Sequence, residues 1–515
     1  MTVIIPAWSR DALRLADTPV VKLAQLLMNN QEPVELLLLQ QLPWLRYQLQ
    51  TNQLTLLPWW NVFDDLQHVT QTTGLPLGIE DLDLPRGTQY VYIGDTVLLQ
   101  REGQLKGTIH FHPAGFVSWV ETTNDEQQRV VKVYDDRGFC STQTTYGRHN
   151  ARLETVWFTP DTQPIMRQNH EGQVALLDTA GNVTQTYPSM SAIITERVQQ
   201  HLVERSDLLI SDANPETATI LTQLAQQHRL AYLLSTQMAP TLPDDLLAAV
   251  ERVIVPTKQM VRKFNQVNAD LGTPIDVISP YATTLALGHS TELPETTLVW
   301  AVNHLTINAQ QTVVQQLVTW LVKDEENYLS VIATSKLTAD KLVHRFQEAI
   351  LAAADIQPDS PEAWFVGDIL SRLQNNQPLD PGVELSDTVK NVIGQLQRIQ
   401  INIRSQMMDQ AREDLLGRAR LLIDLGTMPD LQLQIGAISA GIPQVNATAT
   451  GYVQDHQNGL IIAHPRDLTT ALDFYLSALI HWNESLVKSI RSLEDLAEPK
   501  LLDYWREVIK NGDNA

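Results

Sequence analysis

The sequence has 515 residues, of which 37 are basic and 59 acidic, so its formal net charge at pH 7 is −22. This charge repels phosphate backbones and anionic lipid surfaces, which argues against nucleic acid and bare membrane as partners. No segment has roughly 18 consecutive uncharged apolar residues, the first residues lack a signal-peptide pattern, and Cys140 is the only cysteine. We therefore expect a cytoplasmic protein of roughly two to four domains, with no membrane insertion, disulfide or thiolate metal site.

The first 85 residues alternate strand and helix patterns. Thr2–Ile5 and Val34–Leu39 are short, mostly apolar runs, and Val20–Met28 carries apolar residues at helical spacing behind a Thr-Pro start signal. The same alternation returns after Pro188 and continues to about residue 280. Such alternation predicts a parallel sheet with right-handed crossovers. We therefore expect an N-terminal Rossmann-like domain built from residues 1–85 and 188–280.

Residues 86–187 have a different pattern, in which short alternating runs are interrupted by Gly, Asn and Asp. The candidate strands are Tyr90–Ile93, Val97–Gln100, Gly107–His112, Val117–Glu121, Arg129–Tyr134, Gly138–Thr142, Leu153–Phe158 and Val174–Leu177. Two turns, at residues 135–138 and 178–181, share an Asp-x-x-Gly signature typical of hairpin corners. We expect an inserted antiparallel β-meander whose acids lie in turns and form no catalytic pair.

Residues 281–480 return to the α/β pattern and predict a second Rossmann-like domain. Helical stripes such as Ala339–Ala353 and Leu385–Arg398 separate the candidate strands. These strands are Leu298–Val302, Leu329–Ala333, Trp364–Val366, Ile401–Arg404, Arg420–Leu425 and Pro443–Val445. Residues 481–515 predict helices without strand material, and we expect them to pack back on the N-terminal domain.

Common cofactor and metal motifs are absent from the sequence. No two glycines are two residues apart and GxxxxGK[ST] does not occur, so ATP and NAD are not expected, and we expect no other cofactor. His110 and His112 have the i, i+2 spacing that places two imidazoles on one face of a strand. Because no third ligand is identifiable, we interpret them as a cross-strand surface pair and expect no metal site.

Residues 415–462 predict a βαβ unit with a closing strand, in which a small-residue helix lies between two short strands. Gly436–Pro443 reads Gly-Ala-Ile-Ser-Ala-Gly-Ile-Pro and is followed by Asn458–Ile462. This unit resembles the C-terminal half-site of GT-B glycosyltransferases, where a Glu-Ala-x-x-x-Gly-x-Pro helix lies under the nucleotide-sugar. The resemblance implies an α/β protein with a GT-B-like fold, two Rossmann-like domains carrying the inserted antiparallel β-meander.

In retaining GT-B enzymes two carboxylates, eight residues apart, hold the donor sugar and its ribose. The resemblance places Met428 and Gly436 at these positions. Neither side chain accepts a hydrogen bond from a sugar hydroxyl as a carboxylate does, so a donor would lack its orienting contacts. We interpret the site as an emptied one, with no catalytic residue and no cofactor-binding residue.

Candidate contacts of the expected cleft are Trp8, Arg418, Arg420, Gln434, Ser439 and Asn446. The two arginines have the charge to neutralise a pyrophosphate, and helix ends or salt bridges are their competing roles. Gln434, Asn446 and the aromatic Trp8 would suit a glycan-binding groove. For Ser439, close helix–sheet packing is the stronger interpretation.

Four dispersed segments extend the resemblance to nearly the whole chain: Ile4–Trp8, Phe63–Gln67, Asp135–Phe139 and Gln434–Asn446. Together they resemble the glycosyltransferase-like component of the accessory Sec system, which serves export of serine-rich-repeat adhesins in Gram-positive bacteria. The resemblance implies a GT-B fold without transferase activity. It also implies two companion accessory Sec proteins, the glycosylated adhesin precursor and the accessory SecA motor as partners, and a peripheral position at the membrane through the translocase.

Two other functions stay open at this point. An inverting glycosyltransferase acting on the adhesin uses a single base and need not keep both glutamates. A glycan-binding module would use the old cleft as a lectin-like groove.

Overall fold

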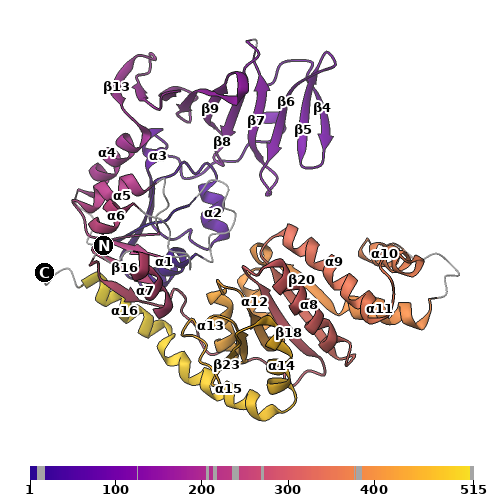
Figure 1. Cartoon of the computed structure of the whole chain (residues 1–515). Coiled ribbons are helices and arrows are strands. Elements are labelled where there is room, and N and C mark those ends of the chain that lie inside the picture. Colours follow the sequence, from indigo (N-terminus) through magenta and orange to yellow (C-terminus); the bar gives the residue numbers. More distant parts are fainter. Residues whose placement is uncertain are drawn as a thin grey trace.

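The computed structural model describes residues 1–8, 18–124, 126–203, 208–212, 217–234, 243–267, 272–375, 377 and 385–510. Within these residues the chain forms three sheets (Figure 1). In that view an antiparallel sheet lies at the top, one α/β domain at the left and a second α/β domain at the lower right. The last helices, in yellow, run from the second α/β domain to the first.

The N-terminal sheet has seven described strands, all parallel, in the order β17-β16-β15-β14-β1-β2-β3. Their bounds are β1 Thr2–Ile5, β2 Val34–Leu38, β3 Trp59–Asn61, β14 Leu208–Ser211, β15 Leu230–Leu233, β16 Arg252–Val255 and β17 Ile275–Val277. Central strand β1 is buried throughout, as a parallel sheet covered on both faces requires. Val3 and Ile5 pack into one layer and Ile4 into the other. The strand order reverses between β1 and β14, as in doubly wound folds.

The helices of this domain are α1 Pro19–Asn29, α2 Leu45–Thr51, α3 Val62–Leu66, α4 Met190–Leu202, α5 Ala218–Ala225, α6 Asp244–Ala249 and α7 Lys258–Val267. A helix from the far end of the sequence, α16 Glu498–Lys510, packs with them. Its Leu501, Leu502, Trp505 and Val508 are buried in the same apolar cluster as residues of α1 and β1. The last described helix therefore completes one core layer of the first domain.

The inserted sheet has ten described antiparallel strands, which lie in chain order. They are β4 Gln89–Ile93, β5 Thr96–Arg101, β6 Gln104–Phe111, β7 Val117–Thr123, β8 Arg129–Tyr134, β9 Cys140–Tyr146, β10 Arg152–Phe158, β11 Pro164–Asn169, β12 Val174–Leu177 and β13 Val183–Tyr187. The sequence patterns missed β11 and β13. Strand β11 begins at a proline and β13 exposes its first four residues, so neither shows clear alternation, and pairing with β12 holds both.

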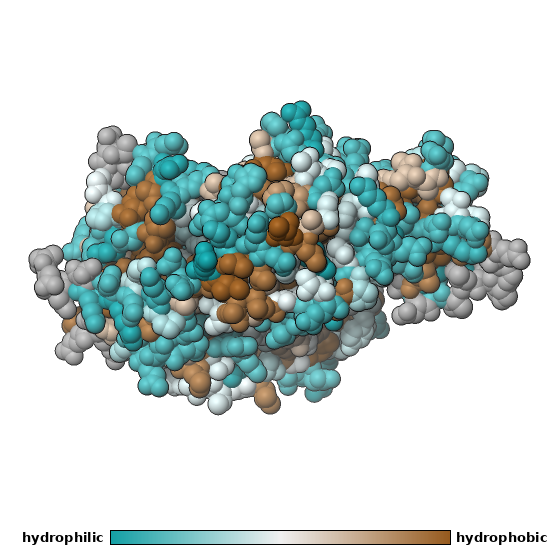
Figure 2. All heavy atoms as spheres, turned by 90° about the horizontal axis from the view of Figure 1, so that it is seen from below, coloured by the Kyte–Doolittle hydropathy of each residue, from teal (hydrophilic) through white to brown (hydrophobic). Residues whose placement is uncertain are grey.

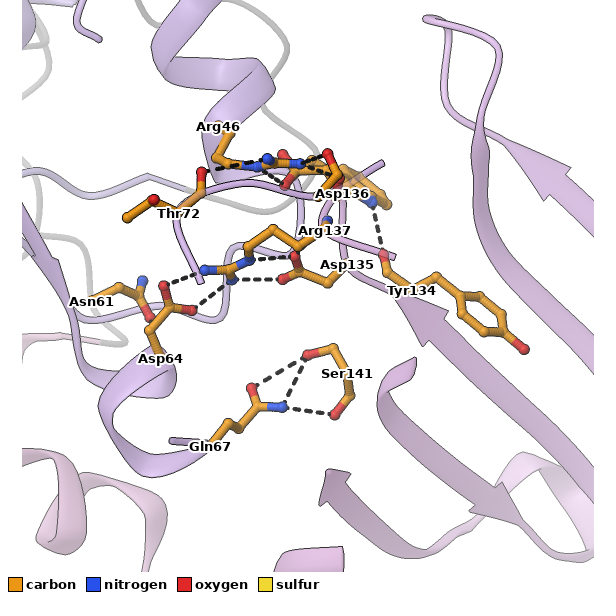
Figure 3. Close-up of polar contacts among 12 residues, drawn as sticks. Arg46, Asn61, Asp64, Gln67, Thr72, Tyr134, Asp135, Asp136, Arg137 and Ser141 are labelled. Carbon is orange, nitrogen blue, oxygen red and sulfur yellow. Dashed lines mark hydrogen bonds and ion pairs between the residues drawn. The ribbon is translucent and has the colours of Figure 1, made fainter. Parts of the chain in front are cut away.

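The turn between β8 and β9 anchors the inserted sheet on the first domain (Figure 3). Arg137 donates to both carboxylate oxygens of Asp64 in α3 and to both of Asp135 beside it. Arg46 of α2 donates to the Asp136 side chain at 2.8 Å and also to its carbonyl. The sequence placed Asp64, Asp135 and Asp136 at caps or turns. The structure adds that they join two domains through buried ion pairs.

The third sheet has six described parallel strands in the order β20-β19-β18-β21-β22-β23. These are β18 Thr296–Val302, β19 Asn327–Ala333, β20 Ile399–Ile403, β21 Ala419–Asp424, β22 Gln444–Asn446 and β23 Gly459–Ile461. The accompanying helices are α8 Ile307–Leu321, α9 Lys336–Ala353, α10 Pro361–Gln374, α11 Asp387–Gln397, α12 Asp409–Arg418, α13 Leu431–Ala440, α14 Leu468–Leu476 and α15 Leu479–Ser492. Here the strand order reverses between β18 and β21.

The prediction of a strand at Trp364–Val366 is wrong, because these residues lie inside α10. Ser360 caps this helix by accepting a hydrogen bond from the Ala363 amide, and Pro361 starts it. Trp364 is 76% exposed and Val366 is fully buried, which is the pattern of an amphipathic helix. A three-residue apolar run does not distinguish the two kinds of element.

Candidate functional site: the cleft between the two α/β domains

In open α/β sheets, ligands bind beyond the carboxyl ends of the strands, where the strand order reverses. In the second domain this position is occupied by Asp424, the last residue of β21, and by Asn303, which follows β18. The Asn303 side-chain amide donates to Asp424 Oδ2 at 3.3 Å. Asp424 is fully buried, so the floor of the site is a carboxyl group without access to solvent.

Asp424 organises the loop that follows β21. Its Oδ2 accepts a hydrogen bond from the Asp430 amide at 2.7 Å, and its Oδ1 accepts one from the Gly426 amide at 3.3 Å. Burial raises the pKa of Asp424 to about 7, although these hydrogen bonds favour the carboxylate. The acid therefore fixes the loop between β21 and α13 at the centre of the expected site.

The N-terminus of α13 is already occupied by a side chain of the protein. Asp430 Oδ1 caps the helix by accepting from the amides of Gln432 and Leu433, each at 3.1 Å. Arg404 donates from Nε to Asp430 Oδ2 at 2.6 Å and from Nη2 to the Gln432 side chain at 2.8 Å. A helix N-terminus is a natural site for a phosphate. Here a carboxylate and its arginine partner fill that site.

The two positions matched to donor-binding carboxylates differ in their surroundings. Met428 lies half-buried in the loop between β21 and α13. Gly436 lies within α13, and a Cβ built on it would be 2.7 Å from Leu416 Cδ1 of α12. A glutamate at position 436 would therefore meet the packed α12 helix. The glycine permits close packing of α12 against α13, and the packing leaves no room for the missing carboxylate.

A cavity of about 340 Å³ lies between α1, α12, α13, α16 and the segment that joins the two domains. Its charged walls are internally paired. Lys22 of α1 donates to Asp409 Oδ2 at 3.0 Å, and Arg412 donates to Asp409 Oδ1 at 2.6 Å. Burial opposes ionisation of Asp409, yet these two cations hold its pKa below the usual range. The Lys22–Asp409 pair also joins the two α/β domains.

The segment that joins the domains is tied to the C-terminal end of α13. The Ser439 hydroxyl donates to the carbonyl of Thr284, and the Ser439 and Ala440 carbonyls accept from the amides of Ala286 and Gly288. Ser439 also lines the cavity. The structure thus gives this predicted cleft residue a specific role in holding the connecting segment.

Gln434 and Asn446 are both fully buried. Gln434 Oε1 accepts from the Thr450 hydroxyl at 2.7 Å, and its carbonyl accepts from the Gln444 side chain at 2.9 Å. Within the described part of the chain, neither amide atom of Asn446 has a hydrogen-bond partner. The two side chains lie beneath the cleft and present no surface to it.

The structure places Arg418 and Arg420 at the wrong edge of the sheet for a pyrophosphate contact. They stand at the amino end of β21, roughly 13 to 20 Å along the strand from Asp424 at the carboxyl end. Arg418 is exposed, and Arg420 donates to the Ser290 carbonyl at 2.7 Å and lies 5.9 Å from the Trp482 ring. Burial lowers the pKa of Arg420. These arginines stabilise the junction with α15 and the connecting segment.

Trp8 is 2% exposed and belongs to the core layer that α16 completes, so its ring is not presented to the cleft. The sequence interpretation overlooked a neighbouring acid, Asp212, which follows β14 at the strand-order reversal of the first domain. Asp212 Oδ1 accepts from the Ala7 amide at 2.7 Å, and burial raises its pKa to about 6. The signal was available, since Asp212 and Asp424 each close an apolar strand.

His110 and His112 are both packed against aromatic rings. His110 stacks on Trp119 at 3.5 Å, and His112 stacks on Phe116 at 4.6 Å. His112 is 3% exposed, so the interpretation of a surface pair is wrong for it. In the described ranges no three His, Cys, Asp or Glu side chains are grouped to hold a metal ion. No helix in those ranges is long and apolar enough to cross a bilayer.

Comparisons with known proteins bear on the fold and the family. The model of a family described as the first accessory Sec system protein matches residues 3–512. The member of that family from Streptococcus gordonii is 25% identical over 526 residues, covering 98% of this chain and 95% of that protein.

Two solved structures have similar folds. Accessory secretory protein 1, 2 and 3 of Streptococcus pneumoniae gives a TM-score of 0.72 at 20% identity, covering 99% of this chain and 100% of the other. The pneumococcal O-GlcNAc transferase GtfA, in complex with UDP and GlcNAc, gives 0.69 at 11% identity, covering 100% and 99%. The predicted GT-B-like fold is confirmed.

Proposed function

Because the chain belongs to the family of the first accessory Sec system protein, we propose that it serves that system as a non-catalytic scaffold with a GT-B fold. In this proposal it assists the export of a glycosylated serine-rich-repeat adhesin. The observation that carries the non-catalytic part is the packing at Gly436. The Cβ of any larger residue there would meet Leu416 at 2.7 Å, so the structure has closed the place of a donor-binding carboxylate.

The phosphate end of the cleft supports the same proposal. A nucleotide-sugar carries a diphosphate, and the α13 N-terminus that would attract it is capped by Asp430. A second acid, Asp424, lies directly behind this cap. Two carboxyl groups at this point disfavour a bound diphosphate by like-charge repulsion unless cations intervene, and Arg404 is already engaged with Asp430.

We propose the companion accessory Sec proteins, the adhesin precursor and the accessory SecA motor as partners. An exposed apolar surface supports a role in an assembly. Leu479, Ile480, Val487 and Ile490 of α15 are between 37% and 61% exposed. Helix α15 lies at the bottom of Figure 1, on the side that Figure 2 shows, where hydrophobic side chains gather in separate patches among hydrophilic ones. Such patches mark interaction sites more often than scattered apolar residues do. The proposed location is cytoplasmic, at the membrane through the translocase.

Calorimetric titration with UDP-N-acetylglucosamine and UDP-glucose tests the non-catalytic part of the proposal. We expect no heat of binding from either donor and no sugar transfer to a serine-rich peptide. Binding of a donor together with transfer would overturn the proposal in favour of an inverting glycosyltransferase.

Co-purification tests the scaffold part separately. The chain is expected to form a stable complex with its two companion accessory Sec proteins when the three are co-expressed. A charge-bearing variant on α15, Val487→Glu, is expected to weaken this complex, and Lys488→Glu beside it is the control for added negative charge. A chain that stays monomeric beside both companions would contradict the scaffold role, whatever the donor titration shows.

A further inference from the structure

A second hollow lies far from the cleft, on one face of the inserted sheet. It encloses about 420 Å³ over strands β7 to β11 and is lined by side chains of those strands together with Gln41 of the first domain. Strand register explains its shape. Residues directly opposite one another in an antiparallel sheet point to the same face. The side chains therefore form rows that cross the strands.

Two rows make up the centre of the hollow. One runs from Trp119 through Val133 and Thr142 to Trp157. The next runs from Glu121 through Val131, Thr144 and Thr155 to Gln168. Small β-branched residues thus occupy the middle strands, whereas Trp119, Trp157 and Gln168 stand toward the two sides. A trough with a low floor and aromatic walls follows directly from this order.

A third row closes one end of the trough. Arg129 lies opposite Tyr146, and Tyr146 lies opposite Arg152. The Arg129 guanidinium is 4.5 Å from the centre of the Tyr146 ring and pairs with Glu121 at 2.9 Å. It also donates to the Asn150 side chain at 3.1 Å. Arg129 is therefore held in place and its charge is balanced, which leaves Arg152 as the exposed cation of the lining.

The main chain beneath the trough is not available to a ligand. Each of the strands β7 to β11 is paired on both sides, so their N–H and C=O groups are used within the sheet. A polypeptide lying on this face could not add a strand to the sheet, which is how extended peptides usually gain affinity. Recognition here must come from side chains alone.

The side chains of the lining have a consistent chemistry. They offer aromatic rings in Trp119 and Tyr146, hydroxyls in Thr142, Thr144 and Thr155, and amides in Gln41 and Gln168. None of the lining residues is acidic, although the whole chain has a net charge of −22. The buried indole N–H of Trp157 has no acceptor among the described residues, so this wall also holds an unused donor.

We propose that this trough binds a neutral oligosaccharide. Sugar rings have an apolar face that packs on aromatic rings and a rim of hydroxyls that bond to amide, hydroxyl and guanidinium groups. Pockets of this mixed composition and a few hundred Å³ are typical of small-ligand sites. The balanced charge of Arg129 favours a neutral ligand over a polyanion. The proposal does not depend on whether the interdomain cleft is catalytic.

The test is binding of the full chain to an array of neutral mono- to tetrasaccharides, followed by calorimetry with the best-bound sugar. A filling variant, Thr144→Trp, places a large side chain on the floor of the trough. The matched control is Gln143→Trp, the adjacent residue of β9, which points to the opposite face beside Lys132. We expect Thr144→Trp to weaken binding by at least roughly tenfold and Gln143→Trp to leave it unchanged.

Arg152→Ala is a second variant at the exposed rim, where loss of the side chain does not disturb the core. It is expected to weaken binding of the same sugar by several-fold while the melting temperature stays at the wild-type value. Four results would overturn the proposal: no neutral sugar bound at millimolar concentration, equal binding by Thr144→Trp and wild type, binding of sulfated sugars only, or binding of an unglycosylated serine-rich peptide at this face.

Discussion

The guanidinium of Arg137 binds the carboxylate of Asp64 through two parallel hydrogen bonds, from Nη1 to Oδ2 at 2.7 Å and from Nη2 to Oδ1 at 2.8 Å. Arg137 belongs to the inserted sheet and Asp64 to the first α/β domain, and only 3% of the arginine side chain is exposed. A bidentate pair fixes direction as well as distance. This pair therefore sets the orientation of the inserted sheet, including its trough, relative to the rest of the molecule.

Arg137→Ala is expected to lower the free energy of unfolding by about 3 to 5 kcal/mol, because it leaves the buried carboxyl of Asp135 and the nearly buried one of Asp64 without their cation. Urea denaturation followed by tryptophan fluorescence measures the loss. The control is Arg167→Ala in the same sheet, whose pair with Glu154 is 55% and 39% exposed and should contribute less than about 1 kcal/mol. Equal losses in the two variants would show that the buried pair has no special weight.

Two glycines within helices provide a test of the packing at position 436. A Cβ at Gly394 of α11 would meet nothing within 4 Å, so Gly394→Ala is expected to stabilise the protein by about 0.5 to 1 kcal/mol through helix propensity. Gly436→Ala should instead destabilise it by about 1 to 2 kcal/mol, because the new methyl meets buried Leu416. Thermal unfolding of the two variants decides the matter. A gain in both would mean that α12 yields easily and that the carboxylate position is open.

Asp424 predicts a dependence of stability on pH. Its pKa is about 7 in the folded chain and near 4 when unfolded, so the folded state holds the proton more tightly. The stability from this group is fully present below about pH 4 and is lost as the pH rises to about 7, by at most about 1.4 kcal/mol per pH unit. Asp424→Asn removes this dependence.

The measurement is urea denaturation of wild type and Asp424→Asn between about pH 4.5 and 7.5. The stability of the wild type relative to the variant should fall across this range. Asp212, whose pKa is also raised, titrates in both proteins and cancels in the difference. A difference that stays constant with pH would mean that the three donors around Asp424 keep it ionised throughout.

Trp505 and Tyr504 are adjacent in α16 and differ in burial, at 2% and 40% exposed. Trp505→Ala is expected to cost about 3 to 5 kcal/mol, because it leaves a cavity in the core layer shared with α1. Tyr504→Ala should change stability by less than about 1 kcal/mol. Chemical denaturation compares the two. A small effect of Trp505→Ala would show that α16 is not part of the first domain's core.

The GT-B-like fold was predictable because its signals are local. The unit β21–α13–β22 follows from short apolar runs and from Gly441, which ends α13 with φ at +71°. Strand β1 was equally clear, since a central parallel strand is apolar throughout. By contrast, β11 and β13 lack a pattern of their own and exist because neighbouring strands offer hydrogen bonds. Their prediction required the sheet to be known first.

The site was harder to predict for two physical reasons. Arg418 and Arg420 were assigned by nearness in sequence to Asp424, but a strand separates its two ends by many ångströms, and its direction decides which end faces the cleft. Trp8 was assigned as an exposed ring, but it lies in a layer with residues of α16, about 490 positions further along the chain. Long-range burial of this kind leaves no mark beside the tryptophan.

The helix that completes the first domain's core has a consequence for synthesis of the protein. Strand β17 ends at Val277, yet Leu501 to Val508 must be present before that core layer is closed. At bacterial speeds near 10 residues per second, the ribosome needs on the order of 20 s to deliver them. During that interval the nascent first domain exposes an apolar groove along α1. Newly made chains are therefore candidates for chaperone binding until translation is nearly finished.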